Sequence, residues 1–225
     1  RKTTSREYLS DSRIKFVELN FSDPQKLCTQ LLQYKKDMGG WDYIVHNLGV
    51  TKCKKQKDFY TINYEITRNF TNALIDCDMV PLKFVYMSSL SVCGKGDEKN
   101  HTPIKLTDTP NPDTHYGKSK LKAEQHLRSL SNFPYIILRP TGVYGPREKD
   151  YLLMMKTIKW SIDFRSGWSK QLITFVYVKD LVKAIFAAVE SDKIQKTYFI
   201  SEEKAYSSSG FSDYVAQELG KKFVL

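Results

Sequence analysis

The sequence of 225 residues contains no apolar run that could cross a bilayer, which takes about 20 consecutive residues. It also lacks a C-x-x-C pair, so neither a zinc site nor a disulfide framework is indicated. Its four cysteines, Cys28, Cys53, Cys77 and Cys93, lie in apolar or lysine-rich segments. We therefore expect free thiols in a reducing compartment, a cytoplasmic location, no bound metal and no membrane contact.

Signatures of nucleic-acid binding are missing as well, although the net charge is +10 and the pI about 9.3. The basic residues are scattered, and the one dense run is 51–57. No helix-turn-helix, zinc or RNA-recognition motif accompanies this run, which is typical of a solvated loop or helix start. We expect no nucleic-acid partner and interpret the basic field as attractive to phosphorylated ligands.

What the sequence does contain is an alternation of short apolar runs with helical patterns, typical of a mostly parallel sheet covered by helices on both faces. The length allows one sizeable α/β domain. The expected strands are Ile14–Leu19, Tyr43–His46, the runs that start at Lys83 and Tyr135, Ile162–Phe164, Gln171–Val176 and Thr197–Ile200. The expected helices are a segment capped by Ser22 or Asp23 and reaching Tyr34, then Lys55–Met79, a helix opened by Tyr116, Asp150–Trp160, Asp180–Glu190 and Ser209–Leu219.

The stretch Tyr116-Gly-Lys-Ser-Lys120 opens one of these helices, and the apolar residues that follow recur at helical spacing. Tyr116 and Lys120 are four residues apart, so both stand on one helix face. A nearby ammonium favours the phenolate and lowers a phenol pKa that starts near ~10. The spacing suits a proton-transfer pair, although Tyr-x-x-x-Lys also occurs in ordinary surface helices.

The segments before and after this helix are both apolar runs that end in a turn or loop. Upstream, the buried run from Lys83 ends in a serine-rich turn that Gly94 closes. Downstream, the run from Tyr135 ends in a Pro/Gly loop that reaches Arg147. This βαβ unit gathers polar groups where its strands end, and open α/β sheets bind ligands at that edge.

With Ser89, Tyr116, Lys120 and Arg139-Pro-Thr-Gly142 in this order, the chain resembles the extended short-chain dehydrogenase/reductase family. That family contains NAD(P)-dependent sugar-nucleotide epimerases and dehydratases, and the resemblance covers nearly the whole chain. It implies an α/β fold, a Rossmann-like doubly wound parallel sheet with a small C-terminal substrate-binding region. Residues 1–147 would bind the dinucleotide and residues 148–225 would form a mixed substrate-binding region, of which 171–200 return to the Rossmann domain.

The family fold begins with a strand, a Gly-rich loop and a helix, and no G-x-x-G-x-x-G occurs here. By resemblance, Ile14–Leu19 is the third strand and Tyr43–His46 the fourth, and in the order 3-2-1-4-5-6 strands 2 and 1 separate them. We therefore expect a preceding segment of roughly 30 residues, the usual length of a βαβ unit, and further C-terminal substrate-domain residues.

The resemblance implies three catalytic residues. Tyr116 is the general acid/base, Lys120 lowers its pKa and holds the nicotinamide ribose, and Ser89 holds the reacting oxygen. Ser88 and Ser91 compete with Ser89, because several serines in one turn are often only hydrogen-bond formers. The predicted cofactor-binding residues are Arg1, Lys2, Asn47, Leu48, Gly49, Asn63, Ser88, Tyr116, Lys120, Pro140, Thr141, Gly142 and Val143, and the predicted substrate-binding residues are Ser91 and Arg147.

For several other positions, a purely structural role is the alternative to a functional one. Asn63 matches an asparagine that braces the active-site loop of the family, but an asparagine within a helix can be purely structural. Arg147 is a candidate for a substrate phosphate, with a surface salt bridge as the alternative. His46 is expected to be a buried, hydrogen-bonded imidazole. Cys93 replaces the usual tyrosine before the glycine, and Lys179-Asp180 replaces a common Asp pair.

The turn Ser89-Leu90-Ser91 stands where 4,6-dehydratases of the family carry Thr-Asp-Glu, so the acid and base for water elimination are missing. Two enzyme classes remain: epimerisation of a sugar nucleotide through transient oxidation of a hydroxyl, and net carbonyl reduction of the ketone or sterol type. A non-catalytic dinucleotide sensor is a third hypothesis, which the intact Ser/Tyr/Lys set disfavours. We expect a small-molecule substrate of the nucleotide-sugar type and consider a homodimer.

The start of the chain bears on the choice of cofactor. An acidic residue after the second strand binds the ribose hydroxyls of NAD, whereas a basic one accommodates the 2′-phosphate of NADP. If the second strand precedes Arg1, the segment 1–6 forms this turn, and it holds no carboxylate before Glu7. Arginine grips phosphate bidentately, so the sequence slightly favours NADP over NAD.

Overall fold

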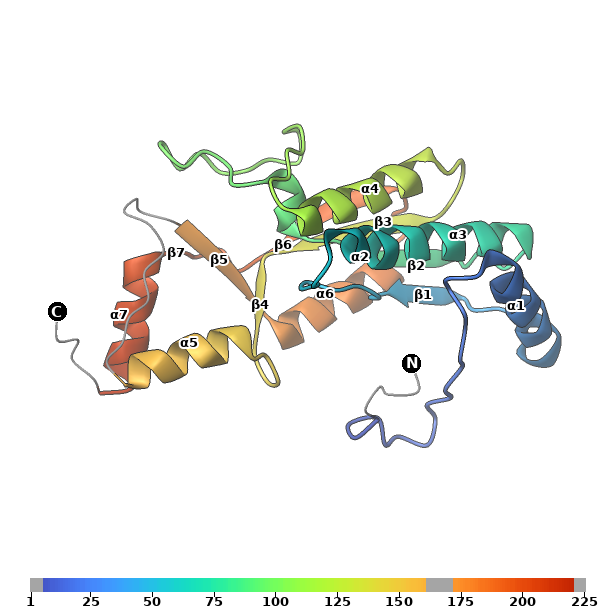
Figure 1. Cartoon of the computed structure of the whole chain (residues 1–225), viewed down its shortest axis with the longest axis horizontal. Helices are drawn as coiled ribbons and strands as arrows, with labels where there is room; N and C mark the ends of the chain where they lie inside the picture. The colour runs from blue at the N-terminus through green and yellow to red at the C-terminus, as the bar shows by residue number, and fades with distance from the viewer. Residues whose placement is uncertain (1–5, 161–171, 221–225) are drawn as a thin grey trace.

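The computed structural model describes residues 6–160 and 172–220, in which a parallel sheet forms the centre (Figure 1). Its strands are β1 (Tyr43–His46), β2 (Lys83–Met87), β3 (Tyr135–Pro140) and β6 (Lys196–Ile200), in the order β1-β2-β3-β6. All three pairings are parallel. The prediction of a Rossmann-like parallel α/β fold is confirmed.

Both faces of this sheet are covered, because alternate residues of β2 and β3 point to opposite sides. Phe84 and Ile137 pack against α1 (Pro24–Met38), α3 (Ile66–Asp76) and α4 (His115–Ser129). Val85 and Ile136 pack against α6 (Val178–Glu190) on the opposite face. In Figure 1, α3 and α4 lie above the sheet and α6 lies below it.

The helix starts follow from local capping. Asp23 caps α1 by accepting from the Lys26 amide at 3.0 Å, and α1 extends to Met38, beyond the expected end at Tyr34. The long helix expected at 55–79 consists of α2 (Gln56–Tyr60), the π-helical turn η1 (Thr61–Glu65) and α3. A π-helical turn inside a helix is frequent at functional sites.

Two expectations at the N-terminal edge of the sheet are wrong. Ile14–Leu19 is not a strand, because a ladder requires a partner strand and β1 pairs only with β2 among the described residues. Phe16 is instead 45% exposed. The strand β1 exists as predicted but is not buried, since Tyr43 and Val45 lie on its uncovered side and are about half exposed.

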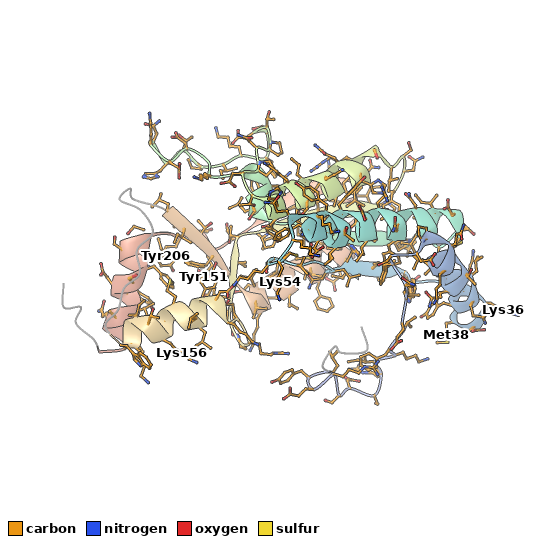
Figure 2. The ribbon with its side chains drawn as sticks, in the orientation of Figure 1. Lys36, Met38, Lys54, Tyr151, Lys156 and Tyr206 are labelled. Carbon is orange, nitrogen blue, oxygen red and sulfur yellow. The ribbon has the colours of Figure 1, made fainter. Side chains whose placement is uncertain are left out.

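The C-terminal part adds a small three-stranded sheet of β4 (Gly142–Tyr144), β5 (Leu172–Tyr177) and β7 (Ala205–Ser207), beside α5 (Asp150–Lys159) and α7 (Ser208–Glu218). The strand β7 was not expected. Tyr151 and Tyr206 approach from α5 and β7 and pack against Phe175 of β5 (Figure 2). The strand expected at 162–164 lies outside the described residues.

None of the helices in 6–160 and 172–220 is long and apolar enough to span a membrane. None of the four cysteines forms a disulfide in the structure, and the sulfurs of Cys28 and Cys77 lie 2.7 Å apart.

Candidate active site

The structure brings Ser89 and Tyr116 together, although 27 positions separate them in the sequence. Ser89 follows β2 and caps the 3₁₀ helix η2 (Leu90–Cys93), accepting from the Ser91 amide at 3.2 Å. Tyr116 lies in the first turn of α4, and a hydrogen bond joins its side chain to that of Ser89. Of the three serines in the turn, Ser89 is therefore the one paired with the tyrosine.

The other two serines have different surroundings. The Ser91 hydroxyl lies 3.2 Å from the Ser89 hydroxyl, so it belongs to the same polar group. Ser88 is buried and donates to Glu124 Oε1 at 2.5 Å. Its hydroxyl is thereby directed into the protein interior, and the structure does not bring it to Tyr116.

Burial raises the pKa of Tyr116, and the hydrogen bond with Ser89 opposes this rise. The sequence led us to expect that Lys120 would lower this pKa. The Lys120 ammonium donates instead to the Met87 carbonyl oxygen at 2.7 Å. The phenol therefore keeps its proton at neutral pH in this structure.

Lys120 is itself a buried cation, with 4% of its surface exposed. Burial lowers its pKa to about 8, and the negative charge of Glu124 opposes that decrease. Its Nζ also lies 5.0 Å from the centroid of the Tyr86 ring. At neutral pH the side chain remains largely an ammonium ion at the carboxyl edge of the sheet.

The loop after β1 lies directly against this lysine. A Cβ atom at Gly49 would come within 3.1 Å of Lys120 Nζ and 3.0 Å of Asn63 Oδ1, so a side chain here would crowd both residues. Asn47 and Leu48 precede it and are exposed. These three predicted cofactor-binding residues present open backbone beside Lys120, which fits the close approach of a dinucleotide.

Asn63 braces this loop from the π-helical turn η1. Its Oδ1 accepts from the Val50 amide at 2.8 Å, and its Nδ2 donates to the Val50 carbonyl at 3.1 Å and to Ser119 Oγ at 3.0 Å. Ser119 in turn donates to the Tyr116 carbonyl at 2.7 Å. Asn63 thus connects the loop after β1 to the first turn of α4.

The predicted nicotinamide wall follows β3 at the same edge of the sheet. Pro140 ends β3, and the Thr141 amide donates to the Ile200 carbonyl at 3.0 Å. Gly142 and Val143 begin β4, where a Cβ on Gly142 would lie 2.4 Å from the Tyr151 hydroxyl. The structure therefore places 140–143 at the carboxyl edge of the sheet.

Arg147, the predicted phosphate ligand, has a positive φ of 75° and lies in the loop after β4. Its guanidinium stacks on the Tyr8 ring, 4.2 Å from the centroid. Arg1 and Lys2 lie outside the described residues. Within the described residues no group of three or more His, Cys, Asp or Glu side chains is arranged to hold a metal ion.

One residue that the sequence analysis missed is Gly117, which is buried between α4 and η2. A Cβ atom there would lie 2.3 Å from the Ser91 carbonyl oxygen and 2.9 Å from Pro112 Cβ. This close approach holds the serine turn beside Tyr116. The signal was present, since a glycine inside a helix costs about 1 kcal/mol relative to alanine.

His46 is the buried, hydrogen-bonded imidazole that the sequence led us to expect. Its Nε2 lies 3.0 Å from Thr67 Oγ1, and its ring stacks on Phe84 at 5.4 Å. Burial, together with the charge of Lys120, lowers its pKa to about 3. The imidazole of His46 is therefore uncharged at neutral pH.

The buried histidine predicts a specific pH dependence of stability. Its pKa in the folded state is about 3, whereas an ordinary imidazole has a pKa of 6.5, so the unfolded state binds the proton first as pH falls below 6.5. Between pH 7 and pH 5 the parent should lose about 2 kcal/mol more unfolding free energy than His46→Phe, which cannot titrate. Urea unfolding at both pH values measures this, and an equal loss in the two proteins would contradict it.

The comparison with protein families places the chain directly. Residues 1–201 match the model of the NAD dependent epimerase/dehydratase family, and the chain belongs to that family. The resemblance to extended short-chain dehydrogenases/reductases is thereby confirmed. This family uses a nicotinamide dinucleotide as its cofactor, which agrees with the expected NAD or NADP.

The similar curated proteins include an epimerase and a short-chain dehydrogenase/reductase. UDP-glucose 4-epimerase of Vibrio cholerae is 30% identical over 144 residues, covering 62% of this chain and 43% of the relative. Short-chain dehydrogenase/reductase family 42E member 1 of Danio rerio is 29% identical over 183 residues, covering 72% and 46%. The chain thus spans less than half the length of these curated relatives.

Solved structures share the fold at lower identity. UDP-glucuronic acid 4-epimerase from Bacillus cereus in complex with NAD is 24% identical with a TM-score of 0.78, covering 96% of this chain and 69% of that one. RMD from Pseudomonas aeruginosa complexed with NADPH is 18% identical with a TM-score of 0.75, covering 92% and 72%. These similarities establish the fold alone.

Proposed function

We propose that the protein is an NAD(P)-dependent sugar-nucleotide epimerase, acting at a hydroxyl-bearing carbon with Tyr116 as the acid/base. The observation that carries this proposal is the hydrogen bond between Ser89 and Tyr116 at the carboxyl edge of the sheet. Lys120 stands one helical turn below, as a buried ammonium. The family membership and the similarity to UDP-glucose 4-epimerase of Vibrio cholerae support the choice of reaction.

Residues at this edge fit a nicotinamide dinucleotide. When bound, the cofactor accepts and returns hydride at the reacting carbon, which no side chain can do. The open backbone at Asn47–Gly49 and the wall 140–143 would hold it, and Lys120 would reach its ribose. Asn63 would act indirectly, by keeping the loop after β1 in place.

The side chains have separate tasks in the proposed reaction. Tyr116 transfers the proton at the substrate oxygen, and this step is worth about 10²–10⁴-fold in rate. Ser89 holds the same oxygen through its hydroxyl, and Lys120 adds positive charge beside it. Ser91 and Arg147 are proposed to bind the substrate, with Arg147 facing a phosphate group.

A carbonyl reductase is the second candidate, and one observation favours it. Burial keeps Tyr116 protonated at neutral pH, and a phenol is poised to donate its proton to a carbonyl oxygen. This is the direction of net reduction. An epimerase must also catalyse the reverse step, in which Tyr116 takes a proton from a substrate hydroxyl.

Cofactor fluorescence separates these candidates. The whole protein is incubated with NAD, NADP or their reduced forms and a panel of nucleotide sugars and ketones, while products are followed by NMR. An epimerase converts its sugar without net change in reduced cofactor, whereas a reductase consumes one reduced cofactor for each product. Absence of dinucleotide binding would contradict both enzymes. Binding without turnover of any substrate would favour the sensor.

The preferred dinucleotide gives a prediction at the start of the chain. We expect Arg1→Glu to weaken NADP binding far more than NAD binding, by about 1–3 kcal/mol, because a charged hydrogen bond to the 2′-phosphate is lost. Isothermal titration of both cofactors against parent and variant measures the difference. Lys26→Glu, on the exposed side of α1, is a matched charge control. A parent that prefers NAD, or equal losses for both cofactors, would remove the argument for NADP.

We also propose the division into a dinucleotide-binding region, 1–147, and a substrate-binding region, 148–225. The separate sheet β4-β5-β7 supports a distinct C-terminal unit, while α6 and β6 pack on the main sheet. A cytoplasmic location is proposed on the basis of the four free cysteines. The proposal also includes assembly into a homodimer.

A further inference from the structure

Glu124 is a carboxylate in the centre of the protein that the proposed chemistry does not use. Its side chain is completely buried in α4, one turn after Lys120. It accepts hydrogen bonds from Arg139 Nε at 2.9 Å and Nη2 at 2.6 Å, from Arg128 Nη1 at 2.9 Å and from Ser88 Oγ at 2.5 Å. A buried charge with this many partners is fully compensated.

Two of the three partners of Glu124 border a residue of the candidate active site. Ser88 directly precedes Ser89 at the end of β2, and Arg139 directly precedes Pro140 at the end of β3. The carboxylate therefore ties the carboxyl ends of two strands to the helix that carries Tyr116. These three elements are far apart in the sequence, and Glu124 is the point at which their polar groups meet.

The charge of Glu124 also acts on Lys120. Two buried side chains four apart on a helix are neighbours, and their interaction is weakly screened in the interior. The other groups facing the carboxylate are Arg139 from β3, Arg128 from α4 itself, Tyr86 from β2 and Cys93 from η2. Among these groups Glu124 is the one that favours the charged form of Lys120.

We propose that Glu124 is a positioning residue of this site: it fixes the Ser88–Ser89 turn against α4 and keeps the buried Lys120 in its ammonium form. The catalytic consequence rests on the proposed function, whereas the effect on Lys120 does not.

The test follows the titration of Lys120 by NMR of its Cε and Nζ nuclei in the whole protein, with the signals assigned by Lys120→Arg. In Glu124→Gln we expect the midpoint to fall by about one pH unit or more, because an opposite charge has been removed. Glu124→Asp keeps the charge and should restore most of the shift. Arg128→Met removes an exposed partner, and the midpoint should stay or rise.

Glu124→Gln leaves Arg139 without its counter-ion and can fail to fold. In that case Glu124→Gln is made together with Arg139→Met, and the double variant should titrate below Arg139→Met alone. An unchanged midpoint in a folded variant overturns the proposal. Because the readout needs no substrate, a parent without turnover contradicts the proposed function but leaves this result intact. If the parent turns over a substrate, the basic limb of the pH profile of kcat should shift in each variant together with the NMR midpoint of Lys120.

Discussion

Tyr116→Phe is expected to reduce turnover by about 10²–10⁴-fold, the usual contribution of general acid–base catalysis. The change removes only the hydroxyl that bonds to Ser89, and the half-buried ring keeps its place, with its centroid 6.4 Å from that of Phe59. Cofactor affinity should therefore be nearly unchanged. Steady-state kcat with the substrate identified by the screen, and isothermal titration of the cofactor, measure the two quantities separately.

Tyr60→Phe is the matched control for this variant. Tyr60 lies on α2, close to the same helix start, and its hydroxyl is 3.3 Å from His115 Nδ1. Because it has no part in the proposed proton transfer, its loss should leave the turnover near the parental value. If Tyr116→Phe retained a rate within a few-fold of the parent, the assignment of the acid/base would be wrong.

Gly117→Ala is expected to cost stability and turnover together. The new Cβ would lie 2.3 Å from the Ser91 carbonyl oxygen, so α4 and η2 must move apart. Overpacking of this kind costs about 1–3 kcal/mol, against a gain of about 1 kcal/mol from the higher helix propensity of alanine. The separation also lengthens the Ser89–Tyr116 hydrogen bond, and we expect kcat to fall at least tenfold in the protein that remains folded.

Gly40→Ala is the control for replacing a glycine by alanine at a position without close neighbours. No atom lies within 4 Å of a Cβ at Gly40, and its φ is not in the left-handed region. Its unfolding free energy in urea should stay within about 0.5 kcal/mol of the parent. If Gly117→Ala were as stable and as active as this control, the close approach of the two elements would have no functional importance.

Several features were predictable because they depend on short-range interactions. Apolar periodicity gave the strands β2 and β3 and the helices that cover them, since burial selects residues by spacing. Asp23 was a recognisable cap because its side chain bonds a backbone amide three residues away. The spacing of Tyr116 and Lys120 likewise places both on one helix face without knowledge of the rest of the fold.

Other features required the folded chain, because they depend on which residues surround a group. Three serines follow β2, and only the packing of α4 shows that Ser89 meets Tyr116 while Ser88 faces Glu124. The expected decrease in the pKa of Tyr116 became an increase, since burial outweighs a lysine that bonds to Met87 instead.

By itself, the sequence determined the α/β class, a cap at Ser22 or Asp23, the order of most of the main elements and the residue types proposed for the site. These follow from local propensity, from periodicity and from motifs within a few residues. The tertiary structure decided which serine faces the tyrosine, that Gly117 is needed, and that Glu124 joins two strands to α4. It also left Ile14–Leu19 without a partner strand. Directions of side chains, burial of charges and pairing of strands are properties of contacts between distant segments, which no local pattern contains.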